Sequence, residues 1–352
     1  MKAPNYRVPS MTEIEALPWN GRNVVSTFSG CGGSCLGYRM AGCRVLYASE
    51  FIPAAQESYK LNHPGSFLDT RDIRDVKPEE ILDRVGLAKG EIDIFDGSPP
   101  CSDFSTAGKR AAGWGKVKNY SDTKQRVDDL FFEYARILAG LQPKAFVAEN
   151  VSGLVKGVAK GYFVEILQTL RGCGYRVSAR VLDAQWLGVP QARKRLIFVG
   201  VREDLEVEPV HPIPLRYAYS IRDAIPWLDD EDEMPERECE DDAPCLEPYA
   251  IGAEWDRTRI GRSSDRYFQL VRPFPDLPSP TITQTASQAG AASVVHPLAK
   301  RKFSALEVRR LCGFPDDFQL AGDYQKRVER LGRAVPPVMM MHIARRLSEV
   351  LP

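Results

Sequence analysis

The chain has 352 residues, of which 43% are hydrophobic and 27% charged, so it is long enough to bury a sizeable core in one or two domains. Its 47 basic and 47 acidic residues give a formal net charge of zero, which at first argues against a nucleic-acid partner. No apolar run approaches the roughly 18 residues of a membrane helix, and the N-terminus has no apolar signal core, so we expect a cytoplasmic protein without a membrane partner.

Strand-like and helix-like segments alternate along the chain up to Val201. Strands are expected at 23–28, 43–50, 91–97, 144–150, 176–184 and 194–201, and helices at 53–63, 127–141 and 162–174. Strands that alternate with helices predict βαβ units, and therefore an α/β fold with a mostly parallel sheet.

The composition changes after Val201. Residues 203–297 are rich in proline and acidic residues and show little sustained periodicity, which indicates a smaller, loop-rich second domain. Helical periodicity returns at 303–315 and 336–351, and the last segment is apolar enough to pack on the first domain. We therefore predict a discontinuous first domain, 1–202 with 298–352, and a second domain, 203–297.

The eight cysteines and four histidines do not form a metal-binding pattern. No two cysteines have C-x-x-C spacing, and the histidines lie far apart in the sequence. We expect no metal, and reduced, unpaired thiols.

The zero net charge hides two segregated runs. Residues 228–247 are dense in acids, whereas residues 108–126 carry six basic side chains and a single acid, Asp122. Because electric fields act locally, a basic loop can bind phosphate even when the total charge cancels. Ordinary solvated surface charge is the alternative for both runs.

A glycine-rich turn, FSGCGG, follows the first expected strand and opens a helix, where backbone can approach a ligand closely. A dinucleotide fingerprint would place a third glycine where this chain has Cys35. Glu50 ends the next strand, 20 residues after Gly30, where a carboxylate can accept hydrogen bonds from ribose hydroxyls. Asp72 stands before the next apolar strand. The pattern indicates an adenosine-containing cofactor, with a tight turn and surface acids as the alternative.

Cys101 follows two prolines at the end of the strand 91–97, and Glu149 closes the strand 144–150. Ligands of open α/β sheets bind at the carboxyl ends of the strands, so we expect the glycine turn, the thiol and the acid to meet at one sheet edge. Taken singly, Cys101 reads as a buried structural thiol and Glu149 as a strand-end acid in a salt bridge. Their combination favours a reaction centre.

One chemistry needs this combination. The C5 carbon of cytosine attacks a methyl donor only after a thiolate has added at C6, which requires a positioned cysteine, an acid at N3 and a cationic group near O2. Arg193 and Arg195 flank Lys194 at a strand start and should point to the same face. A solvated strand start is the alternative for these two arginines.

These residues belong to a set of ordered motifs in which the chain resembles the DNA (cytosine-5) methyltransferases. The motifs are FSGCGG, SPPC, ENV at 149–151, QARKR, RKFSALEVRRLCGFP and GRAVPP at 332–337. The resemblance implies a Rossmann-like fold that uses S-adenosylmethionine and yields S-adenosylhomocysteine. It also implies that residues 203–297 form a small target recognition domain.

The resemblance also implies site residues. Cys101 would be the nucleophile, Glu149 the acid at N3, and Arg195 with Arg193 a contact to the flipped base. Asn150 would support the loop that carries Cys101. The cofactor would lie against Phe28, Ser29, Gly30, Gly32, Gly33, Glu50, Phe51, Asp72, Ile73, Leu130 and Val335.

Double-stranded DNA is the implied partner. Its expected contacts are Ser105, Lys109, Arg110, Lys116 and Lys118 in the basic stretch and Thr283 and Gln284 in SPTITQT. Two positions depart from the family pattern: Ser102 stands where many members have Gln, and Arg333 where Asn is usual. We expect a monomer, with a cognate restriction endonuclease as a candidate further partner.

Four alternatives remain open from the sequence. They are a tRNA cytosine-5 methyltransferase, an amino-methyltransferase of the same fold, a nicotinamide-dependent oxidoreductase, and a DNA-binding relative without activity. Cys101 stands where amino-methyltransferases place an aromatic residue, and the missing third glycine counts against a nicotinamide cofactor. The recognition sequence is not readable from these residues.

Overall fold

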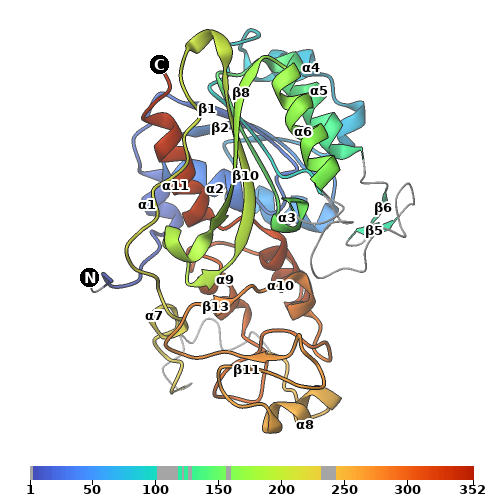
Figure 1. The fold of residues 1–352 in the computed structure, drawn as a ribbon, viewed down its shortest axis with the longest axis vertical. Coiled ribbons are helices and arrows are strands. Elements are labelled where there is room, and N and C mark those ends of the chain that lie inside the picture. The colour runs from blue at the N-terminus through green and yellow to red at the C-terminus, as the bar shows by residue number, and fades with distance from the viewer. Residues whose placement is uncertain (1–2, 101–117, 121–122, 126–128, 156–159, 231–242) are drawn as a thin grey trace. The chain divides into compact units, whose positions relative to one another are not determined.

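The structure of the chain is a computed structural model that describes residues 3–100, 118–120, 123–125, 129–155, 160–230 and 243–352. It divides into two compact units, which we describe separately (Figure 1). The sheet unit comprises Leu17–Leu182, Lys194–Pro212 and Met340–Pro352, and the loop unit comprises Met1–Ala16, Asp183–Arg193 and Ile213–Met339.

The sheet unit is built on a seven-stranded sheet in the order β3-β2-β1-β4-β7-β10-β8. Its strands are β1 (Asn23–Thr27), β2 (Arg44–Ser49), β3 (Phe67–Asp69), β4 (Ile94–Gly97), β7 (Ala145–Val151), β8 (Tyr175–Asp183) and β10 (Lys194–Arg202). The pairings from β3 to β7 are parallel, and β10 runs antiparallel to β7. The predicted α/β class with a mostly parallel sheet is confirmed.

The strand order reverses at β1. The chain passes from β1 outward to β2 and β3, and then returns to place β4 on the other side of β1. In open α/β sheets the connections on either side of such a switch point diverge, and the crevice between them binds ligands. The carboxyl ends of β1 and β4 are therefore the expected position of the cofactor site.

Helices flank the sheet. They are α2 (Gly33–Met40), α3 (Pro53–Asn62), α4 (Pro78–Val85), α5 (Leu130–Leu141), α6 (Lys160–Gly172) and α11 (Pro337–Ser348), with the 3-10 helices η1 (Ile73–Asp75), η3 (Ser152–Val155) and η6 (Glu203–Leu205). A separate two-stranded ribbon consists of β5 (Lys118–Tyr120) and β6 (Thr123–Gln125). No helix among the described residues is long and apolar enough to cross a membrane.

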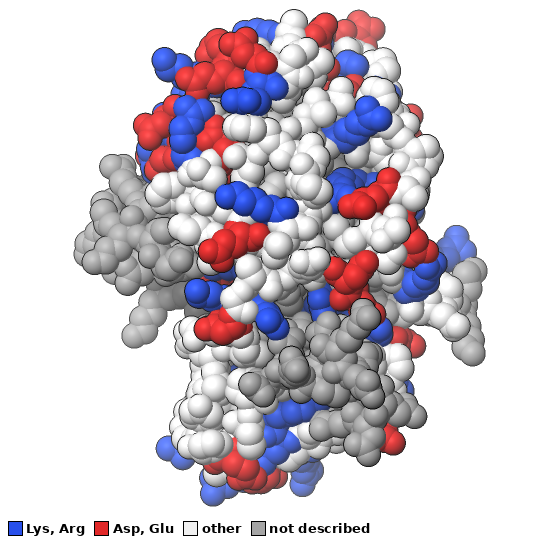
Figure 2. Space-filling view, turned by 180° about the vertical axis from the view of Figure 1, so that it is seen from behind, with Lys and Arg blue, Asp and Glu red and all other residues white. Residues whose placement is uncertain are grey.

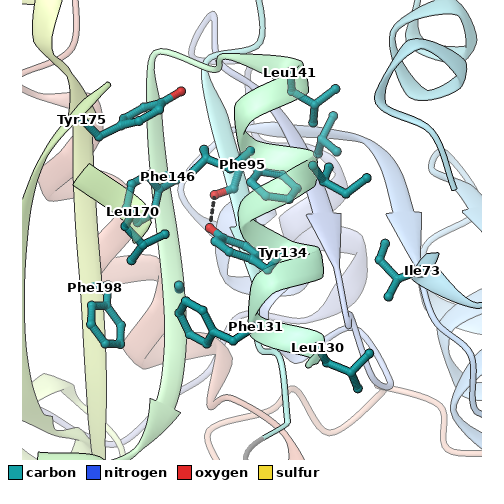
Figure 3. Close-up of a cluster of buried hydrophobic side chains, with 14 of the residues drawn as sticks. Ile73, Phe95, Leu130, Phe131, Tyr134, Leu141, Phe146, Leu170, Tyr175 and Phe198 are labelled. Carbon is teal, nitrogen blue, oxygen red and sulfur yellow. Dashed lines mark hydrogen bonds between the residues drawn. The ribbon is translucent and has the colours of Figure 1, made fainter. Parts of the chain in front are cut away.

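The main hydrophobic core lies between the sheet and helices α4, α5 and α6, which lie side by side (Figure 1). Helix α5 presents buried residues at helical spacing, and its Tyr134 stacks on Phe95 of β4 with ring centroids 4.6 Å apart. The Tyr134 hydroxyl donates to the carbonyl oxygen of Phe95, so its polar end is satisfied inside the core (Figure 3). This packing fixes β4, the strand that leads to Cys101.

The loop unit consists of short elements. They are α1 (Met11–Glu15), η5 (Ala184–Leu187), β9 (Gln191–Ala192), α7 (Ile221–Ala224), α8 (Ala250–Arg257), β11 (Arg262–Ser263), β12 (Val271–Arg272), β13 (Ser279–Pro280), η9 (Gln284–Ser287), α9 (Ala305–Leu311) and α10 (Tyr324–Arg333). Strand β11 pairs antiparallel with β12, and β13 pairs parallel with β9. A small core of Leu246, Ile251, Leu270 and Val295 lies under α8.

This division differs from the domain boundaries expected from the sequence. Residues 298–339 were assigned to the sheet-containing domain, but they fall in the loop unit because α9 packs against α7 and α10 packs against η9. Residues 1–16 also fall in the loop unit, where the Tyr6 hydroxyl donates to the carbonyl oxygen of Arg310. Helical periodicity alone cannot tell which of two units a helix covers.

Candidate active site

The turn between β1 and α2 has an unusual backbone. Phe28, Gly30 and Gly32 all have positive φ, at 54°, 58° and 94°. Glycine is needed at position 32 for a second reason, because a Cβ atom there would lie 2.2 Å from Nε2 of the buried His63. A phenylalanine in the left-handed region is uncommon, and such strain concentrates at functional sites.

Glu50 joins the end of β2 to this turn. Its carboxylate is only 8% exposed, and its two oxygens accept hydrogen bonds from the backbone N–H groups of Gly30 and Ile52, each at 2.7 Å. Glu50 and the glycine turn are thus in direct contact. The neighbouring Phe51 is 37% exposed, so its ring remains available to a ligand.

Three further predicted cofactor residues meet in the same region of the sheet unit. Ile73 and Leu130 are buried in the main core, and Phe28 packs against that core. Asp72, at the start of η1, pairs with Arg74 at 2.9 Å, and Arg74 also pairs with Asp129 at 2.7 Å. The Asp72 carboxylate is therefore held in place by a neighbouring guanidinium group.

Glu149 and Arg195 form an ion pair at the end of β7. Arg195 Nε lies 2.7 Å from Glu149 Oε1, and both side chains are largely buried. In the β7–β10 ladder Glu149 lies opposite Ile197, so Arg195, two residues away on β10, faces the same side of the sheet. The pair combines a carboxyl group with a fixed positive charge.

Asn150 links β7 to the segment that precedes Cys101. Its side-chain amide donates to the carbonyl oxygen of Pro99 at 3.4 Å, and its oxygen accepts from the Val151 N–H at 2.8 Å. Strands β4 and β7 are parallel neighbours, so their carboxyl ends lie side by side. A contact of this kind supports the backbone two residues before Cys101.

Arg193 has a different environment from the one expected. Its guanidinium group is 1% exposed and donates to the carbonyl oxygens of Ile282, Gly332 and Ala334 within the loop unit. It does not share a continuous strand with Arg195, because β9 ends at Ala192 and β10 begins at Lys194. The period-2 argument for a common face therefore does not apply to these two arginines.

The other predicted residues of the loop unit lie in or next to η9 and α10, which pack against each other. Val335 is buried, Gln284 is exposed, and the hydroxyls of Thr283 and Thr285 hydrogen-bond at 2.6 Å. Arg333, which departs from the family pattern, pairs with Glu329 one turn earlier on α10, at 2.9 Å.

Several predicted residues lie outside the described residues. They are Cys101, Ser102, Ser105, Lys109, Arg110 and Lys116, together with the side chain of Lys118. Among the described residues no group of three or more His, Cys, Asp or Glu side chains is arranged to hold a metal ion.

The structure draws attention to residues that the sequence analysis missed. In the loop unit four arginines between α8 and β12 are exposed, and we call them the arginine segment: Arg257, Arg259, Arg262 and Arg266. Asp256, directly before this segment, pairs with Lys300 at 2.6 Å. Four arginines within ten residues could have indicated an anion-binding segment from the sequence. The denser acidic run before them, however, dominates the composition of this region.

The switch point, the glycine turn and the acceptor carboxylate at the end of β2 form the arrangement with which α/β enzymes, among them the S-adenosylmethionine-dependent methyltransferases, bind nucleotide-containing cofactors. Within that class, the family model for the C-5 cytosine-specific DNA methylase matches residues 22–349, and the chain belongs to this family. It is therefore an enzyme of the DNA (cytosine-5-)-methyltransferase type, and the resemblance found in the sequence motifs is confirmed.

Characterised relatives match along nearly the whole chain. The type II methyltransferase M.NgoPII of Neisseria gonorrhoeae is 30% identical over 97% of this chain and 99% of that protein. M.Sau96I of Staphylococcus aureus is 31% identical over 99% of this chain and 80% of that protein.

Solved structures share the fold. A prophage-encoded protein of E. coli, described as a DNA modification methyltransferase, has a TM-score of 0.74 and 21% identity over 94% of this chain and 99% of that one. DNMT2 of Spodoptera frugiperda has a TM-score of 0.63 and 18% identity over 91% of this chain and 98% of that one.

Proposed function

We propose that the chain transfers the methyl group of S-adenosylmethionine to C5 of a cytosine flipped out of double-stranded DNA at a specific short sequence, through a covalent bond between Cys101 and C6. The observation that supports this most directly is the Glu149–Arg195 ion pair beside Asn150, whose side chain contacts Pro99. Neighbouring strand ends thus supply an acid and the segment that leads to a thiol, as nucleophilic attack on a pyrimidine ring requires.

The residues at the switch point fit S-adenosylmethionine. The Glu50 carboxylate, fixed by the N–H groups of Gly30 and Ile52 at the end of β2, stands where such acids accept hydrogen bonds from ribose hydroxyls. The exposed ring of Phe51 offers a stacking surface to adenine. When bound, the cofactor supplies an electrophilic methyl group. The turn Phe28–Gly33, Asp72, Ile73 and Leu130, all in the sheet unit, would hold it.

In the proposed reaction Glu149 first takes up a proton from solvent. The Cys101 thiolate then adds to C6 while Glu149 passes this proton to N3, which makes C5 nucleophilic. After methylation a solvent-derived base removes the C5 proton, the C6–sulfur bond breaks, and the N3 proton returns to Glu149. Arg195 orients the Glu149 carboxyl and presents positive charge towards O2. Arg193 acts as a positioning residue, because it holds the chain just before β10 through three carbonyl contacts.

DNA contacts are proposed in both units. Ser105, Lys109, Arg110, Lys116 and Lys118 would bind phosphates around the emptied position, at a flipping cost of roughly a few kcal/mol. In the loop unit, Thr283, Gln284 and the arginine segment would contact the target sequence. On the face drawn in Figure 2 acidic and basic side chains are interspersed, so local groups of cations rather than the net charge would attract the polyanion.

Arginine in the major groove pairs bidentately with O6 and N7 of guanine, which is the commonest specific contact to a base. We therefore propose that the recognition sequence contains guanine. We further propose a cytoplasmic protein that acts as a monomer. Its relatives are named type II methyltransferases, which supports a cognate restriction endonuclease as a further partner.

Tritiated methyl transfer to duplex DNA and to tRNA, followed by nucleoside analysis of the product, tests this function. We expect 5-methylcytosine in duplex DNA, and covalent attachment of the protein to a duplex that carries 5-fluorocytosine at the target. The Cys101→Ser variant should lose both while still binding DNA. Methylation confined to tRNA, or an N-methylated product, would contradict the proposal.

A further inference from the structure

A buried carboxylate lies directly beneath the glycine turn and has no role in the proposed chemistry. Asp96, on β4, is 2% exposed. Its Oδ2 atom accepts hydrogen bonds from the hydroxyls of Ser34, at 2.7 Å, and Ser26, at 2.9 Å, and its Oδ1 atom accepts from the Tyr38 hydroxyl at 3.2 Å. Three hydroxyl donors from β1 and α2 therefore converge on one acid of β4.

These contacts hold both ends of the glycine turn. Ser34 lies in the first turn of α2, immediately after the glycines. On the other side, the Ser29 hydroxyl donates to Ser26 at 3.0 Å, and Ser26 in turn donates to Asp96. The turn that the cofactor would contact is thus hydrogen-bonded on both sides, through Ser34 and through Ser29 with Ser26, to the carboxylate of Asp96.

The charge state of Asp96 decides how many of these donors it can serve. An ionised carboxylate only accepts hydrogen bonds, whereas a protonated one carries a hydrogen on one oxygen and must itself find an acceptor. An asparagine replaces one oxygen by an NH2 group, which cannot accept from a hydroxyl. Either change therefore forces at least one of the three hydroxyls to stop donating to residue 96 and to reorient, without altering the size of the side chain.

The surroundings place this change near physiological pH. Burial raises the pKa of Asp96 to about 6, while the hydrogen bonds from Ser34, Ser26 and Tyr38 oppose the rise and the negative charge of Glu149 adds to it. The other titratable groups that face Asp96 are Cys35, Tyr38 and Tyr134, and burial raises the pKa of each of these above its usual value, so they are neutral.

We propose that Asp96 is a positioning residue for the cofactor: its ionised carboxylate sets the conformation of the Phe28–Ser34 turn, and thereby the affinity for S-adenosylmethionine. This inference rests on the proposed cofactor site. It concerns binding rather than the covalent steps. Because β4 ends at Gly97, four residues before Cys101 in the sequence, the carboxylate ties the cofactor turn to the strand that leads to the nucleophile.

The test measures the affinity of the full-length protein for S-adenosylhomocysteine by titration calorimetry between about pH 5 and about pH 8. In the wild type the affinity should rise with pH, because the fraction of ionised Asp96 grows as the pH passes through about 6. Asp96→Asn should weaken binding about tenfold or more at neutral pH, the usual cost of lost hydrogen bonds to a charged group, and should flatten the pH profile. KM for S-adenosylmethionine should rise in parallel, with kcat at saturation little changed.

Asp93 provides a matched control on the same segment. It is also buried, but it precedes β4 and is bonded to Arg22, Lys144 and the Asn23 N–H, at the sheet edge away from the turn. Asp93→Asn should lower the melting temperature yet keep the affinity and its pH profile. Should Asp96→Asn fail to fold, Ser34→Ala, which removes one donor, should give a smaller loss of affinity.

The outcomes separate this inference from the proposed function. The positioning role is overturned if Asp96→Asn keeps the wild-type affinity and pH profile. If that variant does not fold, the same result in Ser34→Ala overturns it. In both cases the proposed cofactor site would stand. An equal loss in Asp93→Asn would show a general effect of stability and would also overturn it. A wild-type protein that binds no S-adenosylhomocysteine at any pH would instead refute the proposed cofactor.

Discussion

In the sheet unit Arg195 faces a carboxylate at the end of a strand, whereas in the loop unit Arg193, two residues earlier, is buried against three carbonyl oxygens. The first guanidinium balances a charge that can take part in a reaction. The second satisfies backbone acceptors that short elements leave without partners. For this pair of arginines, the regular sheet leaves one guanidinium group to face a reactive carboxylate, while the irregular unit uses the other to hold its own backbone.

The largest expected effect lies in the sheet unit. Glu149→Gln keeps the size of the side chain but removes the acid, so kcat for methyl transfer should fall about 10²- to 10⁴-fold, the usual contribution of a general acid. Thermal unfolding should change little. The matched control is Glu133→Gln on α5, which breaks the ion pair with Arg136 and should leave kcat unchanged. Undiminished turnover in Glu149→Gln would remove this residue from the reaction.

A comparable substitution in the loop unit should act on stability. Arg193→Ala leaves three buried carbonyl oxygens without their donor, and we expect the free energy of unfolding to fall by about 3 kcal/mol. Hydrogen exchange should accelerate around residues 282 and 332–334. Arg195→Ala, by contrast, should lower kcat and leave exchange in the loop unit as it was. If both variants lose activity and neither loses stability, the distinction between the two arginines is wrong.

The same contrast explains what the sequence could predict. The strands β1, β2, β4 and β7 are short and mostly buried, and their rich content of apolar residues predicts them from the sequence. The rule that ligands bind at the carboxyl ends of the strands predicts that the glycine turn, Cys101 and Glu149 lie at one edge of the sheet. These predictions needed only local pattern and one topological rule.

The loop unit offered no such rule. Arg193 contacts Ile282, 89 positions away in the sequence, and Gly332, 139 positions away. No periodicity in the sequence predicts these contacts. The short helix α10 was missed, and the helix expected at 303–315 is confined to Ala305–Leu311. Even in the sheet unit, the role of Asp96 was hidden, because its three hydroxyl partners come from two elements that the sequence places 58 to 70 residues away.

The smallest effect is expected on DNA affinity, from substitutions in the arginine segment of the loop unit. Replacing Arg259 and Arg262 by alanine should weaken binding to target duplex about tenfold. The slope of log affinity against log salt should become shallower by about 1 to 2 if the two side chains contact phosphates. Affinity for S-adenosylhomocysteine should not change. Arg176→Ala, an exposed arginine of the sheet unit that pairs with Glu208, is the control and should leave DNA binding as it is.

A modified duplex separates base contacts from phosphate contacts. Placing 7-deazaguanine at each guanine of the target removes the N7 acceptor that arginine uses. If Arg262 binds guanine, the modified duplex should weaken binding of the wild type but not of an Arg262→Ala variant, and the salt slope should stay the same in both. If the modification weakens binding of the two proteins equally, Arg262 contacts the phosphate backbone instead. If the variant that lacks both Arg259 and Arg262 binds target duplex as tightly as the wild type, the whole segment is ordinary solvated surface. The DNA contacts of the loop unit would then have to be sought among other side chains. They would still differ from the side chains that hold this unit together, such as Arg193, which is bound to three carbonyl oxygens.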